Sequence, residues 1–304
     1  MSSRPLRIGL AVADNGLPRE LVDQVLRCPK LLVQAIYHPR WNLCRKLAEQ
    51  HEAVACPSLQ TFLHKSEAAV VIEPNWMGSL FVRECLLAGK PVLTFPTATA
   101  ALRDTDLEDI QKVCRDRSAM FVPGLSERWS RSTLRLRELT ATNLGAIEHL
   151  VIKRSFLEWN EQFIPWLDWC GYVVQSAVES VELTREGICQ LFFRRRTSTG
   201  EPVTANLERP SHDNLETIEV QCRHGRVTIS GVDHLQWQTD RQPVSEDLSL
   251  DRNVIAVMLD LFGRRVVGGL VPVPDAGDLL QAHRLLAALL QSQREARRVE
   301  MKIH

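Results

Sequence analysis

The sequence predicts an α/β fold in its first part, with a doubly wound parallel sheet, followed by an α+β domain with an open, mainly antiparallel sheet. Residues 1–122 alternate short apolar runs with helical patterns of about ten residues, which is typical of a parallel sheet covered by helices. After Pro123 and Gly124 the pattern changes to alternating runs separated by turn signals, which favours antiparallel strands. We therefore expect two domains, 1–122 and 123–304.

The N-terminal domain is expected to contain six strands with helices between them. The strands are predicted at 7–12, 31–37, 52–55, 68–72, 91–95 and 119–122. A first helix is opened by Pro18 and continues to about Leu26, and others are expected at 41–50 and 58–65. The helix from about Gly78 to Ala88 ends on Gly89, because glycine tolerates the left-handed conformation of a helix stop.

The C-terminal domain begins with one helical pattern, "SERWSRSTLRLRELTATN", which ends before Gly145. Alternating runs follow from Ala146 to Gln238, and the stretches "TSTG" and "RHGR" predict tight turns between strands. Two helices are then expected, at 250–262 and 275–294. This order predicts a meander of antiparallel strands followed by two helices.

Composition indicates a globular protein rather than a nucleic-acid or membrane protein. The 37 basic and 37 acidic residues cancel, so no net charge attracts a polyanion or an anionic membrane surface. No apolar run is long enough to cross a bilayer, and no secretory signal is visible at the N-terminus. Eight cysteines are scattered without a CxxC pair, which favours reduced, buried thiols in a cytoplasmic protein and no metal site.

Four stretches in this order resemble the glucose-fructose oxidoreductase / inositol dehydrogenase (Gfo/Idh/MocA) family. "PSLQTFLHKSEAAVVIEPNW" is similar to the family's short helix and fourth strand, and "LLAGKPVLTFP" resembles its "aGKhVlxEKP" signature. "LRELTATNLGAIEHL" and "HRLLAALLQSQREARRVEM" resemble the entry to its second domain and its last helix. The resemblance implies a Rossmann-like dinucleotide-binding domain, NAD(P) as any cofactor, and a C-terminal sheet that often makes an oligomer interface.

The phosphate-binding loop of the family does not carry over. Its three GxGxxG glycines fall on Val12, Asp14 and Leu17. A Cβ at the second position obstructs the approach of the backbone to a pyrophosphate, and a carboxylate there repels it. The acid that holds the ribose aligns with His38, beside Arg40, which could pair with a 2′-phosphate or simply open a helix. The sequence therefore argues against tight dinucleotide binding.

The predicted cleft lacks the family's lysine. Thr94 and Phe95 stand where the family has Glu and Lys before the retained Pro96. Phe can neither donate nor accept a proton, so we expect a core or cleft-wall role for it. Asn75 lies in the "P-N" turn after the fourth strand and is also expected in the cleft.

The second domain lacks the family's catalytic histidine. The family's DxGxH segment with its trailing Asp aligns with "EQFIPWLD", so Glu161 replaces the first acid and Pro165 the histidine, while Asp168 matches the trailing Asp. Nearby tryptophans, Trp166 among them, could stack on a ligand ring or could fill the space of an absent cofactor.

We interpret the chain as a homologue that keeps the scaffold and has lost the chemistry. It would bind a small-molecule ligand, a related active subunit or further copies of itself through the C-terminal sheet. The alternative is an NAD(P)-dependent oxidoreductase on a sugar or cyclitol-like substrate that uses Asp168, Glu161 or Glu73 as a substitute acid. A third, weaker possibility is a structural subunit with no small ligand.

Overall fold

The computed structural model divides the chain into two compact units. The first comprises residues 1–126 and 253–280, and the second comprises 127–252 and 281–304. The structure describes residues 4–12, 19–73, 78–100, 102–155, 158–209, 216–231, 233–239, 243–249 and 253–301. The sequence-based division at 122/123 follows chain order, whereas the compact units interleave, because residues 253–280 return to the first unit.

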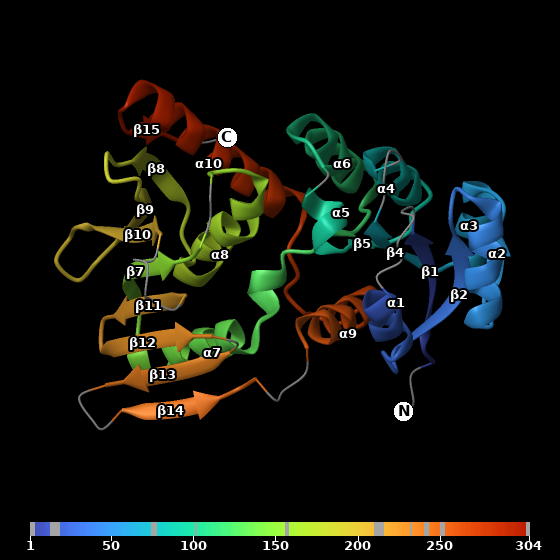
Figure 1. Ribbon diagram of the computed structural model, residues 1–304, viewed down its shortest axis with the longest axis horizontal. Coiled ribbons are helices and arrows are strands. Elements are labelled where there is room, and N and C mark those ends of the chain that lie inside the picture. The colour runs from blue at the N-terminus through green and yellow to red at the C-terminus, as the bar shows by residue number, and fades with distance from the viewer. Residues whose placement is uncertain are drawn as a thin grey trace. The chain divides into compact units, whose positions relative to one another are not determined.

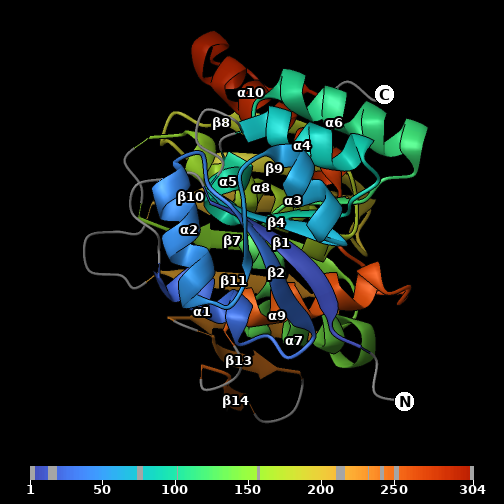
Figure 2. The same cartoon turned by 90° about the vertical axis from the view of Figure 1, so that its right-hand side faces the viewer.

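The first unit is built on a six-stranded parallel sheet, seen in Figure 2 with β1 and β2 side by side. Its strands are β1 (Leu6–Val12), β2 (Leu31–Tyr37), β3 (Val54–Cys56), β4 (Ala68–Glu73), β5 (Val92–Thr94) and β6 (Phe121–Val122). They lie in the order β3-β2-β1-β4-β5-β6. Strands β2 and β3 are thus added on one side of β1, and β4, β5 and β6 on the other. This order confirms the predicted doubly wound, Rossmann-like sheet.

The helices of the first unit follow from the alternation seen in the sequence. They are α1 (Arg19–Leu26), α2 (Trp41–Gln50), α3 (Leu59–Lys65), α4 (Gly78–Leu87), α5 (Pro96–Ala100), α6 (Asp104–Arg117) and α9 (Val254–Val266). β4 is a continuous apolar run, and its residues Ala68 to Ile72 are fully buried, as expected for a strand covered on both faces. The helix α4 ends as predicted, with Gly89 at a positive φ of 70°.

The return of α9 to the first unit has a clear physical basis. Lys30, just before β2, forms an ion pair with Asp260 of α9, at 2.5 Å. Gly263 of the same helix lies so close to Leu31 that an added Cβ would stand 3.3 Å from its side chain. The buried residues Val257, Met258, Leu259 and Phe262 give α9 its apolar face.

The second unit is built on a nine-stranded mixed sheet (Figure 1). Its strands are β7 (Ile147–Lys153), β8 (Val178–Leu183), β9 (Cys189–Arg196), β10 (Pro202–Glu208), β11 (Thr217–Cys222), β12 (Gly225–Ser230), β13 (His234–Gln238), β14 (Val244–Asp247) and β15 (Val299–Glu300). They lie in the order β14-β13-β12-β11-β7-β10-β9-β8-β15. β7 and β10 pair in parallel and the other neighbours pair antiparallel, so the sheet is mainly antiparallel, as predicted.

The helices of the second unit differ from the sequence prediction at its start. The expected single helix over "SERWSRSTLRLRELTATN" is wrong, because the stretch forms a 3₁₀ turn (Ser126–Trp129), α7 (Arg131–Leu139) and a π-helical turn (Thr140–Leu144). The break occurs because the Ser130 side chain accepts a hydrogen bond from the Thr133 N–H and so caps a new helix. A second 3₁₀ turn (Glu161–Phe163) leads into α8 (Ile164–Val174), and α10 (Ala276–Glu295) runs from the first unit into the second.

Candidate functional site

The end of β5 is where the sequence places the family's reactive pair. Thr94 and Phe95 are both completely buried. The Thr94 hydroxyl lies 2.8 Å from that of Thr99, and the Thr99 hydroxyl also accepts a hydrogen bond from the Gly124 N–H, at 2.8 Å. These contacts show that Thr94 serves the local structure, and that the Phe95 ring packs in the core.

The backbone around this strand end leaves no spare volume. A Cβ added at Gly124 would lie 2.5 Å from the Thr94 carbonyl oxygen and 2.6 Å from the Phe95 carbonyl carbon. The Phe95 N–H donates to the Val71 carbonyl, which ties the strand end to β4, and its carbonyl accepts from the Thr99 N–H of α5. The strand end is therefore a packed corner, and of the two roles expected for Phe95, core or cleft wall, its complete burial favours the core.

Of the aligned phosphate-loop residues, Val12 ends β1 and is buried. Asp14, Leu17 and Asn75 lie outside the described residues. Glu73 ends β4, and its side chain also lies outside the described part.

The residue at the ribose position is turned into the protein. His38 is 2% exposed, and its Nδ1 accepts a hydrogen bond from the Arg40 N–H, at 2.9 Å. Arg40 is the N-cap residue of α2 and is exposed. The imidazole thus satisfies a backbone donor at a helix start, a place where a dinucleotide fold usually presents a carboxylate to the ribose.

These observations test whether the described residues fit a dinucleotide. The ribose position carries a buried imidazole engaged with backbone, and the nicotinamide end carries the buried Phe95 ring. Neither group supplies the hydrogen bonds that a ribose or a reacting carbonyl needs. The ribose and nicotinamide positions in the described part of the chain therefore do not fit the cofactor.

In the second unit, Asp168 is held in a buried ion pair. Its two carboxylate oxygens accept hydrogen bonds from Nε and Nη2 of Arg128, at 2.6 and 2.5 Å. The side chains are only 3% and 9% exposed. The guanidinium of Arg128 also stands 4.7 Å from the ring centroid of Tyr172, which Arg137 approaches to 4.3 Å. The pair therefore fastens α8 to the turn before α7.

The first turn of α8 carries the other aligned residues. Pro165 stands at the start of the helix, where its missing N–H costs nothing. Trp166 lies under the guanidinium of Arg154, 4.3 Å from the ring centroid, and meets Trp169 edge to face. Glu161, in the preceding 3₁₀ turn, is exposed. Of the proposed substitute acids whose side chains are described, Asp168 is paired and Glu161 faces solvent.

Two arginines that organise these residues were missed at the sequence level. Arg128 lies in "SERWS" and Arg154 follows β7, and neither stands in a pattern that separates it from a surface cation. The one available signal was Asp168 between apolar residues in "WLDW": a carboxylate that is buried there requires a cationic or hydrogen-bonding partner.

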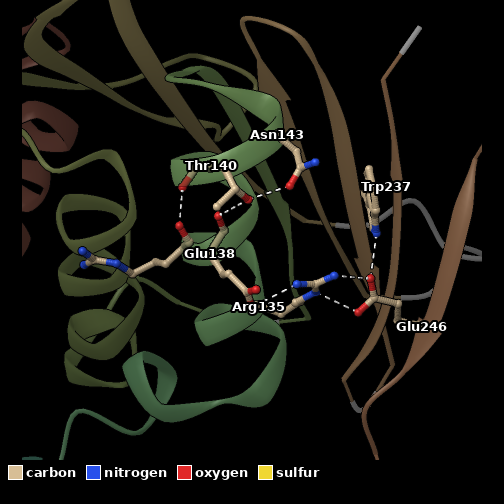
Figure 3. Close-up of polar contacts among 8 residues, drawn as sticks. Arg135, Glu138, Thr140, Asn143, Trp237 and Glu246 are labelled. Atoms are coloured by element: carbon tan, nitrogen blue, oxygen red, sulfur yellow. Dashed lines mark hydrogen bonds and ion pairs between the residues drawn. The ribbon is translucent and has the colours of Figure 1, made fainter. Parts of the chain in front are cut away.

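A further ionic cluster, not foreseen from the sequence, joins α7 to the edge of the nine-stranded sheet (Figure 3). Arg135 donates from Nε and Nη2 to the carboxylate of Glu246 on β14, both at 2.9 Å, and also pairs with Glu138. The Trp237 indole N–H donates to the same carboxylate at 2.8 Å. These bonds, chiefly that from Arg135, hold the pKa of Glu246 below its ordinary value.

The remaining expectations concern cysteines, metals and membranes. All eight cysteines are free, and all except Cys114 are buried. Burial raises the pKa of Cys85 to about 12. Within the described ranges, no three His, Cys, Asp or Glu side chains gather into a possible metal site. No helix in the described part of the chain has the length and apolar character needed to span a bilayer.

Comparisons with known proteins identify the fold. No protein-family model and no curated protein sequence matches the chain. Among solved structures, an oxidoreductase from Sinorhizobium meliloti matches with a TM-score of 0.81 at 12% identity, over 98% of this chain and 100% of that one. The aldose-aldose oxidoreductase from Caulobacter crescentus matches with a TM-score of 0.76 at 19% identity, over 98% and 100%.

A UDP-N-acetylglucosamine 3-dehydrogenase from Acidithiobacillus ferrooxidans matches with a TM-score of 0.74 at 16% identity, over 96% of this chain and 98% of that one. At identities this low, the matches support the same fold, and the chemistry has to be argued from the residues of this chain. The chain therefore has the fold of the Gfo/Idh/MocA-type oxidoreductases, as the resemblance in its sequence predicts.

Proposed function

We propose that the protein is a catalytically degenerate homologue of these oxidoreductases that binds a ligand or a partner in place of transferring hydride. The observation that carries this proposal is the pairing of Asp168 with Arg128. Asp168 is the only aligned acid that matches the family pattern, and it is committed to a buried cation. A proton acceptor must be free to receive a proton from the substrate in the transition state.

The proton balance of a dehydrogenase explains why this matters. Oxidation of a secondary alcohol releases a hydride from carbon and a proton from oxygen, so a base must take that proton. Phe95 and Pro165 have no group that titrates, and protonation of Asp168 would leave the Arg128 charge buried without its partner. The described positions thus favour a scaffold over a working hydride-transfer site.

The alternative is an NAD(P)-dependent oxidoreductase on a sugar or cyclitol-like substrate. The similarity of the fold to known oxidoreductases favours it. It would need Glu161 or Glu73 as the base, together with a cofactor held without the three glycines. Under this alternative, changing whichever glutamate is the base to glutamine abolishes turnover and leaves the melting temperature unchanged.

A cofactor titration separates the two candidates. The protein is titrated with NADH and NADPH to about 1 mM while the melting temperature and the nicotinamide fluorescence are followed. A ligand at about 100 times its Kd stabilises the folded state by roughly 2.7 kcal/mol, which is an easily measured shift. We expect no saturable change with either cofactor, and a saturable rise at micromolar concentration would refute the degenerate assignment.

We also propose a homo-oligomer through the C-terminal sheet, in a cytoplasmic protein whose free thiols suit a reducing compartment. The open face carries the in-register row Phe192, Thr204, His149, Gln221 and Arg226 across five strands. Thr204→Glu is expected to reduce the mass measured by light scattering to that of one chain. An unchanged oligomer, or a wild-type monomer, would contradict this assignment.

A related active subunit as the partner would be found by co-purification.

A further inference from the structure

The second unit contains a pocket of about 700 Å³ that uses none of the residues aligned with the family's chemistry. It lies among the β8–β9 turn, the end of β10, the segment before the 3₁₀ turn at 161–163, and the later part of α10. Its apolar lining comes from Trp159, Leu183, Ile188 and Leu290. Trp159 is 9% exposed and packs on Phe163, with ring centroids 4.5 Å apart.

The walls of this pocket are held by hydrogen bonds. The Leu183 N–H donates to the buried hydroxyl of Ser292 on α10, at 2.9 Å, and that hydroxyl donates to the Arg297 carbonyl at 2.7 Å. In the β8–β9 turn, the Thr184 N–H donates to the Ile188 carbonyl at 2.9 Å, and Gly187 supplies the positive φ of 81°. The pocket is preformed, which lowers the entropy cost of binding a ligand.

The rim of the pocket carries charges of both signs. The cations are Arg185 and Arg209, and the anions are Glu158, Glu186 and Glu208. Within the described part of the chain, Arg185 and Glu208 form no ion pair with each other, although both line the same pocket. A cation and an anion that line one cavity without pairing with each other match the two ends of a zwitterion.

We propose that this pocket binds a short peptide with free termini and apolar side chains. Arg185 would receive its carboxylate, Glu208 its ammonium group, and the four apolar residues its side chains. The volume exceeds that of a single amino acid and lies within the range of sites for drug-sized ligands, roughly 300–1,000 Å³. The proposal does not depend on the proposed function, because a working oxidoreductase could carry the same second site.

The test is calorimetric titration of the full chain with a leucine-rich tripeptide, compared with its N-acetylated and C-amidated forms. We expect the free peptide to bind, and each blocked form to bind roughly tenfold more weakly, the loss expected for one charge-assisted hydrogen bond. Arg185→Gln should weaken the free peptide similarly and remove the difference between the free and amidated forms. Glu208→Gln should likewise weaken the free peptide and remove the difference between the free and acetylated forms.

Two matched variants serve as controls. Arg194→Gln and Glu182→Gln remove charges from β9 and β8 outside the pocket lining, and they should bind the peptide as the wild type does. Melting temperatures establish that all four variants fold. The proposal is overturned if the wild type binds no peptide at about 10 mM, since a Kd above that concentration corresponds to a binding free energy of less than about 3 kcal/mol. It is also overturned if blocked and free peptides bind equally, or if the control variants lose affinity as much as the pocket variants.

Discussion

Replacing Asp168 by Asn tests the structural role that we assign to this carboxylate. The change keeps the shape of the side chain but removes the charge that faces Arg128, whose side chain is 9% exposed. Breaking a buried pair by removing one partner typically costs about 3–5 kcal/mol, because an uncompensated charge stays buried. For a unit of roughly 150 residues, each kcal/mol lowers the melting temperature by about 2–4 °C, so we expect a fall of roughly 6–20 °C.

The assay is thermal unfolding followed by circular dichroism, with the double variant Asp168→Leu/Arg128→Met as the internal comparison. Removing both charges replaces the pair by apolar groups, which is often neutral or stabilising, so the double variant should melt above the single one. A fall of less than about 2 °C for Asp168→Asn would refute the reasoning. A stable single variant that loses a measurable turnover would instead identify Asp168 as a functional acid.

Three further predictions concern other parts of the molecule. Arg135 lowers the pKa of Glu246 in the folded state, so the carboxylate stabilises the fold above the ordinary value of 4.5, and this stabilisation is lost as the pH falls through the folded pKa. Glu246→Gln should therefore weaken the fall in the free energy of unfolding at acid pH, measured by urea unfolding at a series of pH values. An unchanged fall would contradict this. Gly124→Ala should destabilise by about 2 kcal/mol or more, since the new Cβ meets backbone at 2.5 Å, while Gly171→Ala, in an open part of α8, should stabilise by about 0.5–1 kcal/mol. Cys85, with a pKa of about 12 and no exposure, should resist iodoacetamide at pH 8 until the protein is denatured, and rapid labelling of the native state would show that the thiol is accessible.

The sequence allowed the fold to be predicted because its signals are local. The apolar run of β4, the helix stop at Gly89 and the turns at Gly200 and Gly225 each depend on a few neighbouring residues. The loss of titratable groups at Phe95 and Pro165 was equally visible, since it needed only residue types in a known order. Both kinds of signal survive without knowledge of long-range contacts.

The contacts that decide the candidate site could not be predicted in this way. Arg128 and Asp168 are separated by 40 positions, and Arg135 and Glu246 by 111, so only the folded chain brings them together. The sequence placed His38 at the position of the ribose acid, and only the structure shows that its ring accepts a hydrogen bond from a backbone N–H two residues away. The packing of α9 with the first unit depends likewise on a long-range contact, the ion pair between Lys30 and Asp260. The sequence shows no sign of this contact, so it led us to expect a second domain that is continuous in the chain.

The interleaving of the two units sets a constraint on biosynthesis. The first unit lacks α9 until residue 266 has been made, and it is complete only at residue 280 of 304. At about 5–20 residues per second, the sheet built from residues 6–122 waits on the order of 10–30 s for that helix. During this interval the surface of β2 and α1 that α9 later covers is exposed on the nascent chain. A ribosome stalled between positions 130 and 250 would therefore display an incomplete domain that is a substrate for chaperones, and cutting the gene at the chain-order boundary would make the same fragment permanent.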